Sequence, residues 1–213
     1  MKVGLLFDLD GTLLDTLGDL RNSVNVALAQ FGYPQRTLAE IRSFVGTGAR
    51  NLSRLSMPEG KDNVDEVLAA FQAHYKDHCN IETGPYAGIP AALEELKDIP
   101  MAIVSNKPDY AVKELAAIYF PGIYALGEVA GIPRKPAPDM LFKAMADIGV
   151  ETCIYIGDSE VDVTTARNAG AIGISVLWGF RDKAQLADAG GACFCQDPLQ
   201  LPALIDAILS QDQ

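Results

Sequence analysis

Val3-Gly4-Leu5-Leu6-Phe7-Asp8-Leu9-Asp10-Gly11-Thr12 places two carboxylates directly after a short apolar run. In an extended strand, residues two apart point to the same side, so Asp8 and Asp10 can converge where the strand ends. Two adjacent carboxylates repel each other, and a bound cation or a proton held by one of them relieves the repulsion. Gly11 and Thr12 supply a tight bend whose backbone N–H groups could receive an anion such as phosphate. The structural alternative is a strand followed by an ordinary polar turn.

A second acidic segment, Gly157-Asp158-Ser159-Glu160-Val161-Asp162, also follows an apolar run and precedes a helix-like stretch. Taken alone, Asp158 could simply cap that helix. Beside Asp8 and Asp10 it becomes a third oxygen donor for Mg²⁺, which prefers a few carboxylates, with waters and substrate phosphate completing its octahedron. The two acidic segments together therefore indicate a magnesium site.

Two polar segments complete the set. Ser105-Asn106-Lys107 follows the apolar residues 101–104, and its small side chains could donate hydrogen bonds to phosphate oxygens. A polar turn before Pro108 is the alternative. Lys135 lies in Lys135-Pro136-Ala137-Pro138, where the prolines stiffen the backbone and suit the lysine to placing a point charge on phosphate.

Composition narrows the class of protein. The chain has 213 residues, 49% of them hydrophobic, which is enough for a substantial core in one domain or two modest ones. Its formal net charge of −11 argues against broad nucleic-acid binding, so a phosphate site must be a local positive spot. No apolar run reaches the length of a membrane span, and the first run is too short for a signal peptide. Four scattered cysteines without zinc-like pairing are expected to be reduced, which favours the cytoplasm.

The chain divides unevenly. Helical periodicity covers residues 17–31, 38–44, 49–55 and 64–75, whereas from residue 81 onward short apolar runs alternate with helical patterns. That alternation predicts an α/β fold with a parallel sheet flanked by helices. The first strand must join this sheet if Asp8 is to meet Asp158, so the helical part is an insertion. Gly84-Pro85-Tyr86-Ala87-Gly88 is the expected second hinge.

In order along the chain, these four segments resemble the four motifs of the haloacid dehalogenase-like hydrolases. The resemblance implies a Rossmann-like core (residues 1–15 and 81–213) and an inserted helical cap (residues 16–80). It also implies Asp8 as nucleophile, Asp10 as general acid and base, and an aspartyl-phosphate intermediate. The phosphoryl group would contact Ser105, Asn106 and Lys135. Mg²⁺ would bind the carboxylates of Asp8 and Asp158 and the backbone carbonyl of Asp10, with Thr12, Ser159 and Asp162 as supporting residues.

The cap segment resembles the phosphoglycolate phosphatase branch through Phe44-Val45-Gly46-Thr47-Gly48-Ala49-Arg50-Asn51-Leu52. There Thr47, Gly48 and Arg50 could read a second anionic group, a small carboxylate, at the start of a helix. The alternative is a glycine-rich helix start with an exposed Arg50. The expected function is a magnesium-dependent phosphatase for a small phosphorylated metabolite, with 2-phosphoglycolate foremost, acting as a monomer or homodimer.

Other functions remain open at this point. The same fold and motifs are shared by β-phosphoglucomutase-like phosphomutases, which return the phosphoryl group to a sugar, and by sugar-phosphate phosphatases and pyrophosphatases. A noncatalytic binding protein that has kept the fold is a further alternative, although the catalytic residue types are all present. The second acid, Asp10, separates the chain from the dehalogenase and phosphonatase branches, whose motifs lack it.

Overall fold

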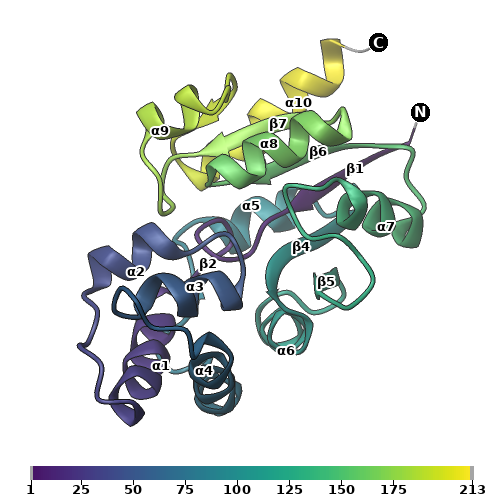
Figure 1. The fold of residues 1–213 in the computed structure, drawn as a ribbon. Coiled ribbons are helices and arrows are strands. Elements are labelled where there is room, and N and C mark those ends of the chain that lie inside the picture. Colours follow the sequence, from purple (N-terminus) through teal and green to yellow (C-terminus); the bar gives the residue numbers. More distant parts are fainter. Residues whose placement is uncertain (1, 212–213) are drawn as a thin grey trace.

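The structure, a computed structural model, describes residues 2–211. Its centre is a six-stranded sheet in the order β5-β4-β1-β6-β7-β8, in which every neighbouring pair is parallel (Figure 1). The strands are β1 (Val3–Phe7), β4 (Met101–Pro108), β5 (Tyr124–Glu128), β6 (Thr152–Gly157), β7 (Ile172–Val176) and β8 (Phe194–Cys195). The α/β class with a parallel sheet is therefore confirmed.

Helices cover both faces of the sheet because its side chains alternate in direction. Phe7 and Ile103 pack on one face with α5 (Ile89–Glu95), α6 (Asp109–Tyr119) and α10 (Leu201–Gln211). Leu6 and Val104 pack on the other with α7 (Asp139–Ile148) and α8 (Glu160–Ala169). Neighbouring residues of β1 and β4 thus face opposite layers, as strand geometry requires. A short helix, α9 (Lys183–Asp188), and a 3₁₀ turn, η1 (Pro198–Gln200), flank β8.

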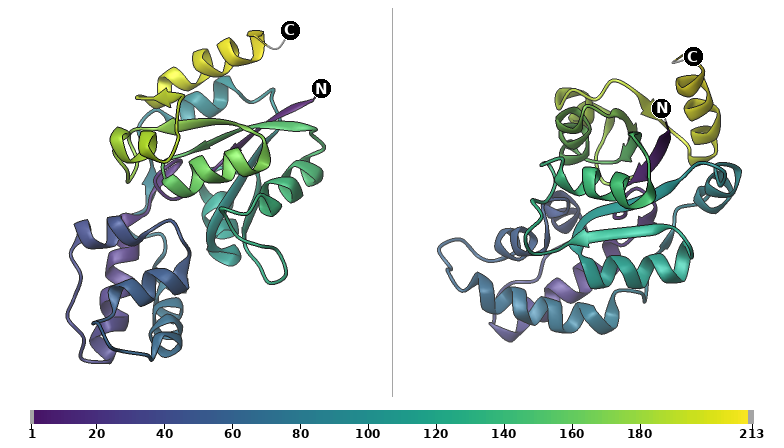
Figure 2. Two further views of the ribbon diagram at one scale, coloured as in Figure 1. Left: turned by 45° about the horizontal axis from the view of Figure 1, so that its top comes forward. Right: turned by 90° about the vertical axis from the view of Figure 1, so that its right-hand side faces the viewer.

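Four helices form a separate group beside the sheet, which we call the helical insertion (Figures 1 and 2). They are α1 (Leu17–Gln30), α2 (Leu38–Phe44), α3 (Ala49–Ser56) and α4 (Val64–His78). Their apolar stripes meet in a core that includes Val24, Leu28 and Phe71, and this core is continuous with one face of the sheet. The four helices match the predicted helical stretches to within three residues at each end.

The insertion is joined to the sheet by two segments that pair with each other. β2 (Leu14–Asp15) and β3 (Gly84–Pro85) form a two-stranded antiparallel ribbon. The buried carboxylate of Asp19, at the start of α1, accepts backbone hydrogen bonds of 2.9–3.0 Å from residues 81–83. The segment predicted as a hinge, residues 84–88, therefore begins in one of two connections that are held together by strand pairing, and the Asp19 hydrogen bonds fix the residues just before it.

The helix cap that was an alternative role for Asp158 lies one residue later, and strand β5 has only a weak apolar pattern. Ser159, not Asp158, is the N-cap of α8, because its hydroxyl accepts from the Asp162 backbone N–H while the Asp162 carboxylate accepts from the Ser159 backbone. β5 lies at the sheet edge, where Tyr124 and Ala125 are only half-buried, so its apolar pattern is weak. Within residues 2–211, the helices all fall short of the length and hydrophobicity that a membrane span requires.

Candidate active site

The carboxyl ends of three neighbouring strands bring the predicted segments together. β1 lies between β4 and β6 and is parallel to both, so Asp8, Ser105 and Asp158 emerge at one edge of the sheet. Lys135 reaches the same edge from the connection between β5 and α7. A pocket of about 40 Å³ lies between this edge and the helical insertion, with room for only a few water molecules. Crevices of this kind, at the carboxyl ends of parallel strands, are where open α/β sheets bind ligands.

Lys135 holds Asp8 and Asp162 in one buried network. Its ammonium lies 2.9 Å from Asp8 Oδ1 and 2.8 Å from Asp162 Oδ1, and it donates a 2.8 Å hydrogen bond to Tyr155 Oη. Tyr155 in turn donates to Asp162 Oδ1 at 2.8 Å. Burial opposes the charge on Lys135, but the two carboxylates outweigh it and raise the pKa of Lys135. All three ammonium protons are thereby used, and Asp162 acts on Asp8 by positioning the lysine.

Asp10 forms an ion pair with a second buried lysine, Lys107. Lys107 Nζ donates to Asp10 Oδ1 at 2.8 Å, and the hydroxyl of Thr16 donates to the same oxygen at 2.6 Å. The Lys107 side chain is only 2% exposed, and burial opposes its charge, but Asp10 outweighs that effect and raises the pKa of Lys107. Neither Lys107 nor Thr16 was among the predicted site residues. The structure thus gives each of the two acids its own cation.

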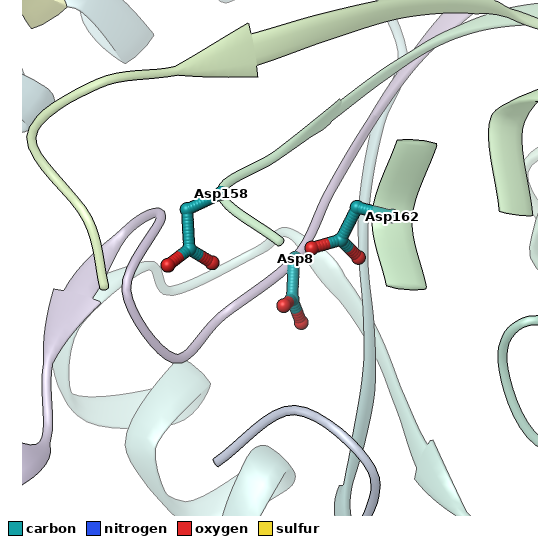
Figure 3. Close-up of side chains that lie close together, drawn as sticks. All are labelled: Asp8, Asp158 and Asp162. Carbon is teal, nitrogen blue, oxygen red and sulfur yellow. The ribbon is translucent and has the colours of Figure 1, made fainter. Parts of the chain in front are cut away.

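Three carboxylates gather around one point. One carboxylate oxygen from each of Asp8, Asp158 and Asp162 lies within 4.8 Å of the other two. Figure 3 shows the three side chains close together. Both oxygens of Asp162 are already engaged, Oδ1 by Lys135 and Tyr155, and Oδ2 by the Ser159 backbone and hydroxyl. Asp8 accepts from the Leu9 N–H and Lys135 through Oδ1 alone. Asp158 accepts from the Phe180 N–H at 2.7 Å and from the Thr12 hydroxyl at 3.4 Å, but within residues 2–211 it is paired with no lysine or arginine. Asp8 Oδ2, which accepts no hydrogen bond there, and the Asp158 carboxylate are therefore better suited to a cation than Asp162.

The charge balance of the site also favours a cation. If all are ionised, Asp8, Asp10, Asp158 and Asp162 carry four negative charges against two positive charges from the two lysines, which leaves two uncompensated. Burial raises the pKa of Asp8 to about 7, because Asp162 and Asp10 add to the burial effect and Lys135 only partly offsets it. Burial and the carboxylates of Asp162 and Asp8 also hold the pKa of Asp158 well above its usual range. A hard divalent cation would neutralise this excess.

Asp162 differs from these two acids in its charge state. Burial would raise its pKa, but the Lys135 ammonium and hydrogen bonds from Ser159 and Tyr155 prevail and hold the pKa of Asp162 below its usual range. It therefore stays ionised and keeps Lys135 charged. Its role as a supporting residue agrees with the geometry, in which it contacts the lysine and the α8 cap.

The backbone N–H groups of the turn after Asp10 are not available to an anion, in contrast to the prediction. Gly11 has φ +83°, and a Cβ there would lie 2.2 Å from Asp158 Oδ2, so glycine permits the close approach. The N–H groups of Gly11 and Thr12, however, donate to the Leu14 and Leu9 carbonyls within the turn. They are not free to receive phosphate. Trp178 fixes this turn through a 2.9 Å hydrogen bond from Nε1 to the Thr12 carbonyl.

Ser105 and Asn106 both line the pocket but differ in what they offer. The Ser105 hydroxyl oxygen accepts from the Lys107 N–H at 3.3 Å, which leaves its proton for a ligand. Asn106 donates its amide protons to the carbonyls of Gly46, at 3.0 Å, and Lys135, at 2.9 Å. The predicted phosphate contact of Asn106 is therefore not supported by its geometry. Both of its amide protons are already donated, one to Gly46 of the insertion and one to the Lys135 carbonyl.

The predicted cap residues separate in the structure. Gly46 and Gly48 line the pocket, and Gly48 is the N-cap of α3. Thr47 instead accepts a hydrogen bond from Asn51 on the same helix. Arg50 has a side chain 51% exposed and pairs with Asp65 of α4 at 2.8 Å. The structure thus brings the glycine turn to the site but does not bring the Arg50 guanidinium there.

Two arginines hold the insertion against the sheet. Arg42 of α2 donates to the carbonyls of Gly179 and Phe180 after β7. In the opposite direction, Arg181 donates to the carbonyls of Arg42, Ser43 and Val45 and also pairs with Glu160 at 2.9 Å. These contacts close the pocket on the side of Asp158.

Comparison with known proteins agrees with this arrangement. The sequence profile of the haloacid dehalogenase-like hydrolases matches residues 5–176. The phosphoglycolate phosphatase of Rhodobacter capsulatus is 35% identical, with 97% of this chain and 98% of the relative covered. The enzyme of that name from Xanthomonas campestris is 33% identical, covering 83% of this chain and 84% of the relative. A crystal structure from Lactobacillus delbrueckii subsp. bulgaricus, assigned as a phosphoglycolate phosphatase, superimposes with a TM-score of 0.89 at 37% identity, covering 95% of this chain and 97% of that one.

Proposed function

This chain belongs to the haloacid dehalogenase-like hydrolases, and on that premise we propose that it is a phosphoric monoester hydrolase whose main substrate is 2-phosphoglycolate. The observation that carries the proposal is the pair Asp8 and Asp10, each within 2.9 Å of its own buried lysine at the end of one strand. Relatives that align over most of the chain at 33–35% identity bear the name phosphoglycolate phosphatase, which supports the choice of substrate.

The proposed reaction proceeds in two displacements. Asp8 attacks phosphorus, the bond from phosphorus to the ester oxygen breaks, and Asp10 gives its proton to the departing alkoxide. Asp10 then removes a proton from a water molecule that attacks the aspartyl-phosphate, and the bond from phosphorus to Asp8 breaks to free inorganic phosphate. Lys135 lowers the repulsion between the Asp8 carboxylate and the substrate phosphate, and the Ser105 hydroxyl is placed to donate to a phosphoryl oxygen.

We propose Mg²⁺ as the cofactor. Its ligands would be the carboxylates of Asp8 and Asp158 and the backbone carbonyl of Asp10. In support, this site carries two uncompensated negative charges, and Mg²⁺ is usually bound through one or two carboxylates together with waters and substrate phosphate. When bound, the ion would neutralise charge on the transferring phosphoryl group.

The helical insertion would act as a lid. We propose that residues 16–80 form a cap domain and residues 1–15 and 81–213 the catalytic core. Because the pocket has room for only a few water molecules, the insertion would swing away to admit substrate and close again to exclude bulk water. The β2–β3 ribbon is the place for that hinge, and the contacts of Arg42 and Arg181 are the ones that must break.

We further propose a cytoplasmic enzyme that acts on small phosphorylated metabolites. The negative overall charge supports a small ligand held by local cations in preference to a nucleic acid. All four cysteines are free thiols, as expected of a protein in a reducing compartment.

The deciding experiment is a phosphate-release assay of the purified protein over a panel of small phosphomonoesters, with Mg²⁺ or with a chelator. We expect the highest kcat/KM with 2-phosphoglycolate and loss of turnover on chelation. A hexose phosphate that is isomerised without phosphate release, in the presence of a bisphosphate, would point instead to a phosphomutase. No turnover of any phosphomonoester would overturn the proposal.

A further inference from the structure

One buried hydroxyl in the pocket has no partner. Tyr75 of α4 is fully buried and lines the pocket, yet its Oη forms no hydrogen bond within residues 2–211. Burial raises the pKa of Tyr75, so the hydroxyl stays protonated and is a donor at neutral pH. Leaving such a buried group unpaired destabilises the folded protein, and the mechanism above gives the hydroxyl no role. An unpaired donor aimed into a pocket points to a ligand acceptor.

Lys107 lies against the same tyrosine. Its ammonium is 4.7 Å from the centroid of the Tyr75 ring and 2.8 Å from Asp10 Oδ1. An ammonium has three N–H donors, and Asp10 takes one of them. Lys107 therefore differs from Lys135, whose three protons are all used by Asp8, Asp162 and Tyr155. The pocket has a fixed positive charge with donors to spare on the side of Asp10.

The start of α3 adds further donors from the insertion. Gly46, Gly48 and Ala49 line the pocket, and the N-cap Gly48 has no side chain to satisfy the first N–H groups of this eight-residue helix. The N-terminus of a helix attracts negative charge through these groups and the helix dipole. Three kinds of anion-binding group thus line the same pocket, from α3, α4 and the end of β4.

The chemistry of the proposed substrate says where its carboxylate must lie. In 2-phosphoglycolate a single methylene carbon separates the ester oxygen from the carboxylate. Asp10 must reach that ester oxygen to protonate it, so the group that reads the carboxylate must be a close neighbour of Asp10. Lys107 meets this requirement at 2.8 Å. Arg50 does not, because its half-exposed guanidinium pairs with Asp65.

We propose that Lys107, the Tyr75 hydroxyl and the N-terminus of α3 form a carboxylate subsite beside Asp10. The subsite selects short alkyl phosphates that carry a carboxylate one carbon from the ester oxygen. Lys107 screens the substrate carboxylate from Asp10. The Tyr75 hydroxyl donates a hydrogen bond to that carboxylate when the insertion is closed over the substrate. This inference rests on the proposed function and names the residues that would give it specificity.

The test is Tyr75→Phe, which removes the hydroxyl and keeps the ring beside Lys107. We expect kcat/KM for 2-phosphoglycolate to fall roughly 10- to 100-fold, while kcat/KM for ethyl phosphate, which has two carbons and no carboxylate, changes less than about threefold. Inhibition by glycolate, measured against an aryl phosphate, should weaken in parallel. The folded protein should be no less stable to heat, because an unpaired buried hydroxyl is lost.

Tyr33→Phe is the matched control. Tyr33 also belongs to the insertion, but its hydroxyl donates to Asn63 at 2.7 Å, and Tyr33 does not line the pocket. It should leave both substrates unaffected. Lys107→Met should lower kcat/KM for both substrates, since Lys107 also contacts Asp10, and the loss should be larger for 2-phosphoglycolate.

Two outcomes separate the subsite from the proposed function. If the wild-type protein hydrolyses 2-phosphoglycolate but Tyr75→Phe lowers both substrates equally or neither, the subsite is overturned and the function stands. If the wild-type protein has the same kcat/KM for ethyl phosphate as for 2-phosphoglycolate, or hydrolyses neither substrate, the proposed substrate is overturned, whatever the variant does.

Discussion

The pocket has two walls of different origin. The sheet wall is formed by residues at the carboxyl ends of strands and by Lys135 of the loop before α7, and Asp8, Asp10 and Asp162 are paired there with buried lysines at 2.8–2.9 Å. The insertion wall is made of a glycine turn, a helix start and a tyrosine without a partner. Most of the charged groups of the sheet wall are thus paired within the protein, whereas the tyrosine hydroxyl of the insertion wall has no acceptor within residues 2–211. We expect the sheet wall to supply the chemistry, and the insertion wall together with Lys107 to recognise the substrate.

The largest effect should come from the sheet wall at Asp8. Asp8→Asn should abolish turnover while the fold survives, because an amide cannot take the phosphoryl group and binds a metal ion poorly. Acid-quenched wild-type enzyme should carry phosphate on Asp8, detectable by mass spectrometry, and the variant should carry none. Substantial activity in a preparation of the variant free of contaminating phosphatase would refute the covalent mechanism.

Lys135→Ala should produce the next largest loss, in both activity and stability. It leaves Asp8 and Asp162 buried without their cation, and breaking a buried pair in this way costs about 3–5 kcal/mol of folding free energy. Loss of one preorganised electrostatic group should also lower kcat/KM by roughly 10²–10³. Lys143→Ala, which breaks an exposed pair with Asp147, is the control and should change little. A near-normal Lys135→Ala enzyme would place Lys135 outside the chemistry.

A smaller effect should link magnesium to pH. The pKa of Asp8 is raised from 3.8 to about 7, and the pKa of Asp158 is also raised, so the metal-free folded protein holds protons that the unfolded chain releases. The stability that they contribute is present at low pH and is lost as pH rises through about 7. Because Mg²⁺ replaces those protons, its increment in Tm should grow between about pH 5.5 and pH 8. An increment that does not vary with pH would contradict this assignment, and Asp158→Asn should reduce it throughout.

The smallest effect should come from the insertion wall at Arg50. Because its guanidinium is half-exposed and paired with Asp65, Arg50→Ala should change kcat/KM for 2-phosphoglycolate and ethyl phosphate less than about twofold. Arg54→Ala, on the same helix and bonded to Asn51, is the matched control. A selective loss of tenfold or more with 2-phosphoglycolate alone would restore the sequence prediction for Arg50 and weaken the case for Lys107 and Tyr75.

The residues of the sheet wall could be predicted because the sequence pattern shows where strands end. An apolar run followed by an acid, a small polar residue or a lysine locates the residue, and parallel order brings the ends together. The sequence pattern did not show which side chains pair with one another. Tyr155 lies inside β6 and is typical of a core position, so its hydroxyl bond to Asp162 left no trace in the sequence. Lys107 is one residue beyond the quoted donors, and only the fold shows that it turns toward Asp10.

The insertion wall was harder, because helical periodicity identifies a buried face without saying what that face will meet. Tyr75 falls four residues after Phe71 and stacks on it at 5.2 Å, which is the spacing of an ordinary apolar stripe. The two glycines of the Gly46-Thr47-Gly48 turn line the pocket, but the direction of Arg50 depends on Asp65 of α4, a partner fifteen residues away. Tertiary packing decides which side chains of a helix look into a pocket.

The paired connections of the helical insertion bear on how such proteins diversify. Because Leu14–Asp15 and Gly84–Pro85 run side by side, the chain leaves the core and returns to it at nearly the same point. Residues 16–83, which lie between them, therefore connect to the sheet in the same way as a single hairpin loop, whatever their content. The insertion could therefore be replaced by another unit without changing the sheet. We expect a helical unit of other size or surface, joined at this ribbon, to leave the strand order and the acids of the core in place while presenting a different wall to the substrate.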